Sequence, residues 1–449
     1  MTSQEDLHEL AEYIVKHGLS IGADQVEAYT LFGSAKSVQV ERGSIRRFTD
    51  VSNSGLGIRI IKNKSIGMAS TTIFTKESIE DCVQNAYSLA KVSPADPHFE
   101  SLPYDEKPSP EIPGRHDQAI IDIEVEEFTG VILEAIKAAQ TTENAIVGGN
   151  FTAGYGERVI VNSLGVDRIS SQTSISGYLG VKIEEDDDIG NAYYYDAATV
   201  YKDFQYLKIG EVAAERAKNM LGSKKIDTAS LPVILDPDST YGTIEPILSN
   251  GINAFSVFNR TAFFVDKIGD IIANEKLNIT DDPFYPGGTD SAPFDDEGVV
   301  PKKLKLVENG VLQTYITDSY TAPLVGLENT GHASRGSFAS RPRPAPYTLS
   351  IEPGRITKDN LLSDLKEGIL LVGSPINSRG SNPQISAQIN QGFYVKDGEI
   401  QYPIKNAVIG CTVFDIYQKI DELSIEIENR NGHQAPWMLL EPLQVSGGK

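Results

Sequence analysis

The chain has 449 residues, which is too long for one hydrophobic core and predicts two or three domains. Its formal net charge of -22, with 62 acidic against 40 basic residues, argues against a nucleic-acid-binding surface, because such a surface needs clustered Lys and Arg. No apolar run approaches the roughly 20 residues that span a bilayer, and the acidic, amphipathic N-terminus differs from a secretory signal. We therefore expect a cytoplasmic protein that binds neither nucleic acid nor membrane.

The first half is predicted to contain one arrangement of helices and strands twice. In the first cycle, a helix over residues 5–17 is followed by four short alternating strands and by a second helix, which Thr75 can cap. In the second cycle, residues 128–139 are helical, strands follow, and residues 203–221 form the closing helix. We interpret the pattern as a duplicated helix and antiparallel-sheet unit.

The domain boundaries are predicted from composition. Six prolines and little periodicity in residues 93–118 indicate a linker, which we place at 99–118. It separates an N-terminal α+β domain at 1–98 from a middle α+β domain at 119–225, a repeat of the first. Residues 226–449 are richer in strands and predict a larger, mostly antiparallel C-terminal domain, so the expected fold class is α+β.

The second half opens with a strand that leads directly into a helix. Leu231 to Leu235 has the pattern of a short buried strand, and Asp238 or Ser239 can cap the helix that follows. Farther along the chain, Asn309-Gly310 and Asp397-Gly398 lie between alternating apolar runs, and each pair predicts a hairpin turn.

Local motifs for metal binding or nucleophilic catalysis are missing from the sequence, including His-Glu-x-x-His and Gly-x-Ser-x-Gly. Cys411 precedes a predicted helix and can be paired in a hypothetical dyad with His332 or His433, although the apolar run before it favours a packed thiol. The Gly-x-Gly at 55–57 is better explained by a close-packed or twisted strand than by dinucleotide binding, because no helix follows it. The acidic run at 184–188 lacks the spacing of a calcium loop and predicts a solvated turn.

A long irregular segment at residues 327–347 gathers positive charge in this acidic chain. It contains His332, Arg335, Arg341 and Arg343, and Pro342, Pro344 and Pro346 stiffen the backbone around the last arginines. Guanidinium groups can hold a peptide C-terminus, acidic side chains or carbonyl groups, which makes these four residues candidates for peptide binding. The alternative is that they pair with the protein's own surplus carboxylates.

Four segments spread along the chain carry a resemblance to a known family. They are VERGSIRRFTDVSNSGLGIRI, LPVILDP, VENGVLQTYITDSYTAPLVGLENTGHASR and VKDGEIQYPIKNAVIG. Their order and spacing resemble the TldD/PmbA family, once labelled modulators of DNA gyrase, and the resemblance covers essentially the whole chain. The resemblance implies a family with two branches, whose members assemble with each other into a cytosolic metallopeptidase. This peptidase acts on unfolded or small peptides. One branch carries His-Glu-x-x-x-His in the helix after the strand equivalent to PVILDP.

This chain departs from the metal-bearing branch at the motif itself. Matching the segment PVILDP to that branch puts Glu245, Pro246 and Asn250 where the first His, the Glu and the second His would fall. Pro246 cannot act as a general base, and Asn250 is a poor zinc ligand. The C-terminal NRNGHQAPW also lacks the cysteine expected of that branch, although His433 lies near its place. The resemblance is thus to the PmbA (TldE) branch, with no catalytic or metal-binding residue in this chain.

Three hypotheses of function follow. The leading one is a non-catalytic subunit of a TldD/TldE-type metallopeptidase complex, in which a metal-bearing TldD-type paralogue holds zinc or a similar divalent metal. The second is an active peptidase or other hydrolase with an unrecognised site that uses His332, His433 or Cys411. The third is a homodimeric binding or scaffold protein. Whether the chain is itself an enzyme stays open, as do its peptide substrate and the stoichiometry of any complex.

Overall fold

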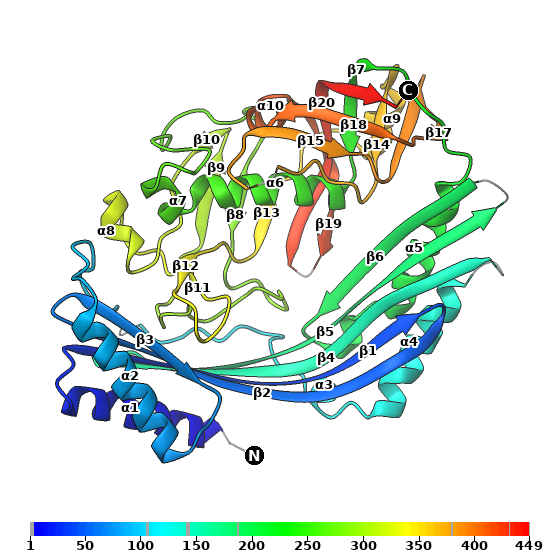
Figure 1. Cartoon of the computed structure of the whole chain (residues 1–449). Helices are drawn as coiled ribbons and strands as arrows, with labels where there is room; N and C mark the ends of the chain where they lie inside the picture. The colour runs from blue at the N-terminus through cyan, green and yellow to red at the C-terminus, as the bar shows by residue number, and fades with distance from the viewer. Residues whose placement is uncertain are drawn as a thin grey trace.

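Two large β-sheets, each with its own helices, make up most of the structure (Figure 1). The computed structural model describes residues 4–104, 107–140, 144–185, 188–378, 380–430 and 432–448. The mixture of helices with extensive antiparallel sheets confirms the predicted α+β class. None of the helices in these ranges combines the length and the apolar character needed to cross a membrane.

The first half forms one curved antiparallel sheet in the order β3-β2-β1-β4-β5-β6. Its strands are β1 (Gln25–Glu41), β2 (Ser44–Lys62), β3 (Ser65–Thr71), β4 (Ala145–Asn162), β5 (Asp167–Glu185) and β6 (Asp188–Ala198). Each predicted cycle supplies three strands, and the two sets join where β1 pairs with β4, from Glu27 opposite Asn162 to Val40 opposite Gly149. The two cycles therefore share a single sheet.

The prediction of four short strands in the first cycle was wrong. Gly33 lies inside β1 and residues 52–55 lie inside β2, because the antiparallel pairing of these strands continues through both positions. Only the turn at Gly43 divides this stretch, where φ is positive (72°). The acidic run at 184–188 includes the last two residues of β5 and the first residue of β6, and the rest of the predicted turn, residues 186 and 187, lies outside the described part of the chain.

Helices cover the convex face of this sheet (Figure 1). They are α1 (Gln4–Ser20), α2 (Lys76–Val92), α3 (Gln118–Ile121), α4 (Val125–Ala139), the 3₁₀ turn η1 (Tyr201–Asp203) and α5 (Tyr206–Asn219). Alternate strand residues such as Ala28 and Ile58 are buried against α1 and α2, and Val181 is buried under α4 and α5. Thr75 caps α2 by accepting a hydrogen bond from the Ser78 amide, as predicted. Cys82 is buried on the inner face of α2.

The proline-rich stretch between α2 and α3 packs against both halves of the molecule. Its described residues form no regular strand or helix, and residues 105 and 106 lie outside the description. Phe99 and Leu102 are buried in a cluster with Ile61 of β2. The Pro113 carbonyl accepts a hydrogen bond from the Gly287 amide of the second half, at 2.9 Å. The connection is therefore held against the first sheet near its start and against the second half near its end.

The second half contains a twelve-stranded, mostly antiparallel sheet in the order β10-β9-β8-β13-β20-β7-β14-β16-β17, with β18 and β19 pairing with β20 and β15 pairing with β18. The strands are β7 (Ala229–Leu235), β8 (Ile279–Asp281), β9 (Leu304–Glu308), β10 (Val311–Leu312), β13 (Leu349–Ile351), β14 (Glu367–Leu371), β15 (Gln384–Gln388), β16 (Gly392–Lys396), β17 (Glu399–Pro403), β18 (Ala407–Thr412), β19 (Ile420–Arg430) and β20 (His433–Gly447). A separate short pair joins β11 (Ala333–Ser334) to β12 (Arg343–Pro344).

Both predicted hairpins are confirmed. Asn309 and Gly310 have φ of 49° and 74° between β9 and β10, and Asp397 and Gly398 have φ of 51° and 77° between β16 and β17. Positive φ at both central residues is the type I′ geometry, whose twist matches that of paired strands.

Helix α6 (Pro237–Ile252) follows β7 directly and anchors the core of the second half. Its N-cap is Asp236, which accepts from the Ser239 amide at 2.8 Å, so the predicted caps Asp238 and Ser239 were wrong. The reason is Pro237, which occupies the first helical turn and makes the preceding residue the cap. The other helices are α7 (Ala254–Phe258), α8 (Thr321–Val325), α9 (Lys358–Ser363) and α10 (Val413–Gln418).

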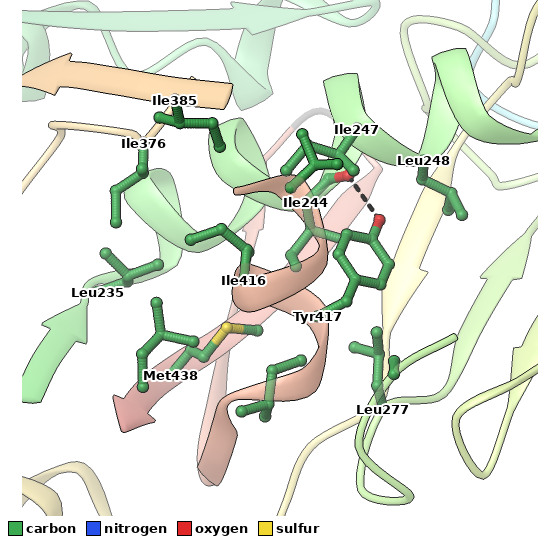
Figure 2. Packing of buried hydrophobic residues seen from close by; sticks show 14 of the residues in the cluster. Leu235, Ile244, Ile247, Leu248, Leu277, Ile376, Ile385, Ile416, Tyr417 and Met438 are labelled. Carbon is green, nitrogen blue, oxygen red and sulfur yellow. Dashed lines mark hydrogen bonds between the residues drawn. The ribbon is translucent and has the colours of Figure 1, made fainter. Parts of the chain in front are cut away.

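Figure 2 shows how α10 packs against α6. Tyr417 is fully buried, and its hydroxyl donates to the Ile244 carbonyl of α6 at 3.0 Å. Ile416 of α10 points into the same cluster, beside Met438 of β20. Apolar burial and one satisfied polar group thus fix the position of α6, which borders the candidate site.

Candidate functional site

The concave face of the six-stranded sheet faces the second half of the chain (Figure 1). Two adjoining cavities are lined by residues of both parts. The cavity beside α6 has a volume of about 600 Å³, and the cavity farther along the sheet has about 650 Å³. Thr289 and Asp290 line both cavities. The chain therefore offers an extended groove on the concave side of the sheet, opposite the helices that cover its convex face.

His433, at the start of β20, is the centre of the α6 cavity. Its Nδ1 lies 2.9 Å from the Tyr241 hydroxyl and 3.3 Å from the Leu349 amide, and its Nε2 lies 2.8 Å from Oδ2 of Asp290. Burial raises the pKa of Tyr241 far above its ordinary value, so the phenol stays protonated and donates a hydrogen bond to Nδ1, which also accepts from the Leu349 amide. Nδ1 is then an acceptor, and Nε2 carries a hydrogen toward Asp290.

The positions singled out by the sequence lie on α6 but do not line this cavity. Glu245 accepts a hydrogen bond from the Ser249 hydroxyl at 2.6 Å, one turn along the same helix. Pro246 stands in the helix interior, and Oδ1 of Asn250 is buried with no hydrogen-bond partner in the described residues. Tyr241 and Gly242 are the α6 residues that line the cavity together with His433. Sequence reasoning missed Tyr241, whose only local signal is its position one turn before Glu245.

The donors around α6 do not fit a transition-metal site. Such a site needs at least three His, Cys, Asp or Glu ligands that converge on one point. In the part of the chain that the structure describes, the one such group is His8, Glu12 and Asp167, on α1 and β5, at the opposite face of the first sheet. At His433 both ring nitrogens are already hydrogen-bonded, and one neighbour is a protonated phenol.

Tyrosines from β6 form the opposite wall of the α6 cavity. Tyr193 and Tyr195 expose about half of their surface, at 52% and 45%, whereas Tyr194 between them is buried. The Arg430 guanidinium lies over the Tyr194 ring at 4.5 Å and pairs with Asp238 at 3.2 Å. Aromatic rings with exposed faces beside a charged rim suit a ligand that carries both apolar and polar groups.

The segment at 327–347 is divided between internal contacts and solvent. His332 is fully buried, with Nε2 at 3.1 Å from Oδ2 of Asp281 and Nδ1 at 3.0 Å from the Thr330 carbonyl. Arg335 pairs with Glu27 of β1, so the alternative of internal pairing holds for this arginine. Arg343 is half-buried and stacks on Phe255 at 3.8 Å, while Arg341 is exposed. The four candidate residues therefore do not form one binding surface in this structure.

Arg335 belongs to a buried ionic network that joins the two halves of the chain. Arg59 of β2 donates to Glu27 at 2.6 Å and to Glu297 of the second half at 2.8 Å, and these side chains are at most 6% exposed. Burial raises the pKa of Glu27, but the Arg335 and Arg59 guanidinium groups outweigh burial and hold that pKa below its ordinary value. Four charges far apart in sequence thus fix the walls of the groove.

The Gly-x-Gly of β2 makes room for the same segment. The Phe338 carbonyl oxygen lies 1.9 Å from the position that a Cβ on Gly57 would occupy, and the Phe338 ring lies 2.1 Å from that of Gly55. Only glycine permits such close approach. The interpretation of this motif as a close-packed strand is confirmed.

The dyads proposed for Cys411 are not formed. Cys411 is the fifth residue of β18, and burial, followed by the nearby Asp415, raises the pKa of its thiol to about 12. The ring nitrogens of His332 and His433 are bonded to the groups described above. A protonated, packed thiol is not a nucleophile at neutral pH.

Comparisons with known proteins cover nearly the whole chain. Profiles of the PmbA/TldA metallopeptidase family match residues 26–90 (domain 1), 98–221 (central domain) and 228–447 (C-terminal domain). A metalloprotease PmbA homolog of Haemophilus influenzae is 27% identical over 465 residues, which covers 99% of this chain and 97% of the homolog.

Solved structures share the fold. TldE from Thermococcus kodakarensis superposes with a TM-score of 0.84 at 23% identity, over 98% of this chain and 100% of TldE. A Thermotoga maritima protein named for modulation of a DNA gyrase superposes with a TM-score of 0.87 at 23% identity, over 98% of this chain and 99% of that protein. Family profiles match most of the chain, and the chain therefore belongs to the PmbA/TldD metallopeptidase family.

Proposed function

We propose that this chain is the metal-free, non-catalytic subunit of a TldD/TldE-type peptidase complex, and that a metal-bearing TldD-type paralogue supplies the catalytic centre. The observation that carries the proposal is the composition of the α6 cavity. Tyr241, Gly242 and a fully bonded His433 stand where the helix meets the groove, and the described residues there offer no set of three converging ligands.

In this proposal the groove holds part of a peptide while the paralogue's zinc, or a similar divalent metal, acts on it. The exposed faces of Tyr193 and Tyr195 and the polar groups near Asp290 are suited to an unfolded segment, which presents backbone amides and mixed side chains. The resemblance to the TldE branch and the likeness to a solved TldE support the pairing. We also propose that the complex works in the cytoplasm, which agrees with the acidic composition and the two unpaired cysteines.

The test is reconstitution from separately purified chains. This chain and the TldD-type paralogue from the same genome are assayed alone and mixed, with unfolded casein and short peptides as substrates, and metal is measured in each sample. We expect chelator-sensitive cleavage by the mixture, co-elution of the two chains, and stoichiometric metal only in the paralogue. Stoichiometric metal and chelator-sensitive cleavage in this chain alone would overturn the proposal.

Two variants locate any metal that is found. His433→Ala removes the histidine of the groove, and His8→Ala removes the histidine of the three-ligand group on α1. If the proposal holds, neither change alters the metal content of the mixture, because the metal belongs to the paralogue. Loss of metal on His433→Ala, with His8→Ala unaffected, would place a metal site in this chain's groove.

A further inference from the structure

An arginine that has no acidic partner among the described residues lies in the larger cavity of the groove. Arg115, in the proline-rich connection, donates from Nη2 to Oε1 of Gln172 on β5 at 3.1 Å, and its buried Nε has no hydrogen-bond partner among the described residues. No carboxylate in the described parts of the chain lies within 4.0 Å of it as an ion pair. A partly buried guanidinium is stabilised by a hydrogen-bond acceptor, so a ligand that brings an acceptor to Arg115 would bind there favourably.

A second arginine adds to the positive charge of this cavity. Arg158 of β4 pairs with Asp296, donates to the Phe294 carbonyl at 2.9 Å and stacks on the Phe294 ring at 4.9 Å. Its Nε is also buried without a hydrogen-bond partner. Burial, and then the Arg158 charge, lower the pKa of Arg115 to about 10, which leaves it protonated at neutral pH.

The acidic side chains that line this cavity do not contact Arg115, and several of them are bonded to other groups. Asp296 accepts from Arg158 and from the Tyr29 hydroxyl, and Asp290 is bonded to His433. Asp295 accepts three backbone amides, while burial and the neighbouring Glu297 raise its pKa well above the ordinary value. Burial also raises the pKa of Glu157. None of these groups is within ion-pair distance of Arg115 in the described structure, although the chain as a whole is strongly acidic.

We propose that Arg115 binds a carboxylate of the peptide that occupies the groove. The guanidinium fork matches a carboxylate in shape and charge, and Gln172, Ser170 and Ser171 beside it supply neutral hydrogen-bonding groups. The carboxylate belongs either to the peptide C-terminus or to an acidic side chain. That the ligand is a peptide rests on the proposed function. That the site binds a carboxylate rests on the geometry of Arg115 alone.

The cavity positions this carboxylate relative to the α6 site. The two cavities meet at Thr289 and Asp290, so a peptide held at Arg115 runs along the concave face of the sheet toward His433. A fixed carboxylate at one end of a groove sets the register of an extended chain, since each residue advances by about 3.3 Å. Arg115 would therefore select which peptide bond is presented at the other end.

The test measures peptide binding to the isolated full-length chain by fluorescence anisotropy. Three N-terminally labelled alanine-based pentapeptides are compared: one with a free C-terminus, one amidated, and one amidated with a single glutamate. We expect Arg115→Gln to weaken carboxylate-dependent binding about 10-fold or more, the effect of losing a charge-assisted bidentate contact. Arg46→Gln, at an arginine whose side chain is 73% exposed, is the matched control and leaves binding unchanged.

The peptides separate the two sources of the carboxylate. Tight binding only of the free C-terminus identifies the terminal carboxylate, whereas binding of the amidated glutamate peptide identifies an acidic side chain. Arg115→Lys keeps the positive charge but lacks the planar guanidinium group, so we expect it to bind the carboxylate peptide with intermediate affinity. Binding by this variant also shows that a substitution at position 115 leaves the protein folded. Equal binding of all three peptides to the wild type, Arg115→Gln and Arg46→Gln would overturn the inference. Because no paralogue is present, this result is independent of whether the reconstituted complex cleaves peptides.

Discussion

Replacing Gly57 with alanine tests how tightly the second half of the chain is seated on the first sheet. An alanine Cβ would stand 1.9 Å from the Phe338 carbonyl oxygen, 3.0 Å from its carbon and 3.7 Å from its Cα. The backbone of the segment must therefore retreat by about 1 Å, because Cβ contacts below 3.0 Å essentially never occur. Inserting one methyl group into such a packed site costs about 1–3 kcal/mol. Arg335, three residues before Phe338, would be drawn away from Glu27 by the same movement.

Gly180 of β5 is the matched control. A Cβ there meets its nearest atoms at 3.7 and 3.9 Å, which is ordinary van der Waals contact. Gly180→Ala should therefore stabilise the protein by about 0.4–1 kcal/mol, because alanine restricts the unfolded chain. The free energy of unfolding is measured by urea titration with circular dichroism, and hydrogen exchange is followed over residues 335–341. Equal stability of the two variants, or unchanged exchange in Gly57→Ala, would refute the close-packing explanation.

Three further predictions follow. Asp318 is buried with Oδ2 unpartnered, and burial and then Glu297 raise its pKa from 3.8 to about 6. The folded state therefore binds this proton more tightly than the unfolded state does. The resulting stabilisation is present below about pH 4 and is lost as the pH rises through about 6. Asp318→Asn should remove this part of the pH dependence of the unfolding free energy in urea titrations, and an unchanged pH dependence would contradict the prediction. Tyr417→Phe should lower the free energy of unfolding by about 0.5–1.5 kcal/mol, because it removes the hydrogen bond to the Ile244 carbonyl. An unchanged free energy of unfolding in urea titrations would show that this hydrogen bond does not stabilise the fold. Cys411 should react with iodoacetamide much more slowly in the folded than in the urea-unfolded protein at pH 8, and rapid native labelling would argue against its packed, protonated state.

Local elements were predictable because their signals are local. Apolar spacing and a Thr75 cap specify α2, and an Asn-Gly or Asp-Gly pair with positive φ specifies each hairpin. The strand at 231–235 and the helix after it were also recognisable from a buried-type run followed by Asp and Pro. The duplicated order of helices and strands was visible, because each copy carries the same turns.

The site was not predictable in the same way, because its contacts are non-local. Gly33 looked like a break in the chain, yet pairing with β2 and β4 on both sides keeps it within one long strand. In the sequence, Arg335 looked available for a ligand. In the structure it forms an ion pair with Glu27, which lies more than 300 positions earlier in the chain. Arg115 gave no sequence signal, since what distinguishes it is the absence of a neighbouring acid in the described fold.

The adjacency of β1 and β4 has a consequence for biosynthesis. The two strands pair over 14 residues although more than 100 residues separate them, so the sheet cannot close until β4 has left the ribosome. Until then one edge of β1 is unpaired in the nascent chain. Because this edge is long and flanked by apolar residues, it is prone to associate with other chains. The duplicated units are in this respect one cooperative folding unit. A chain released at residue 98 would expose that edge permanently.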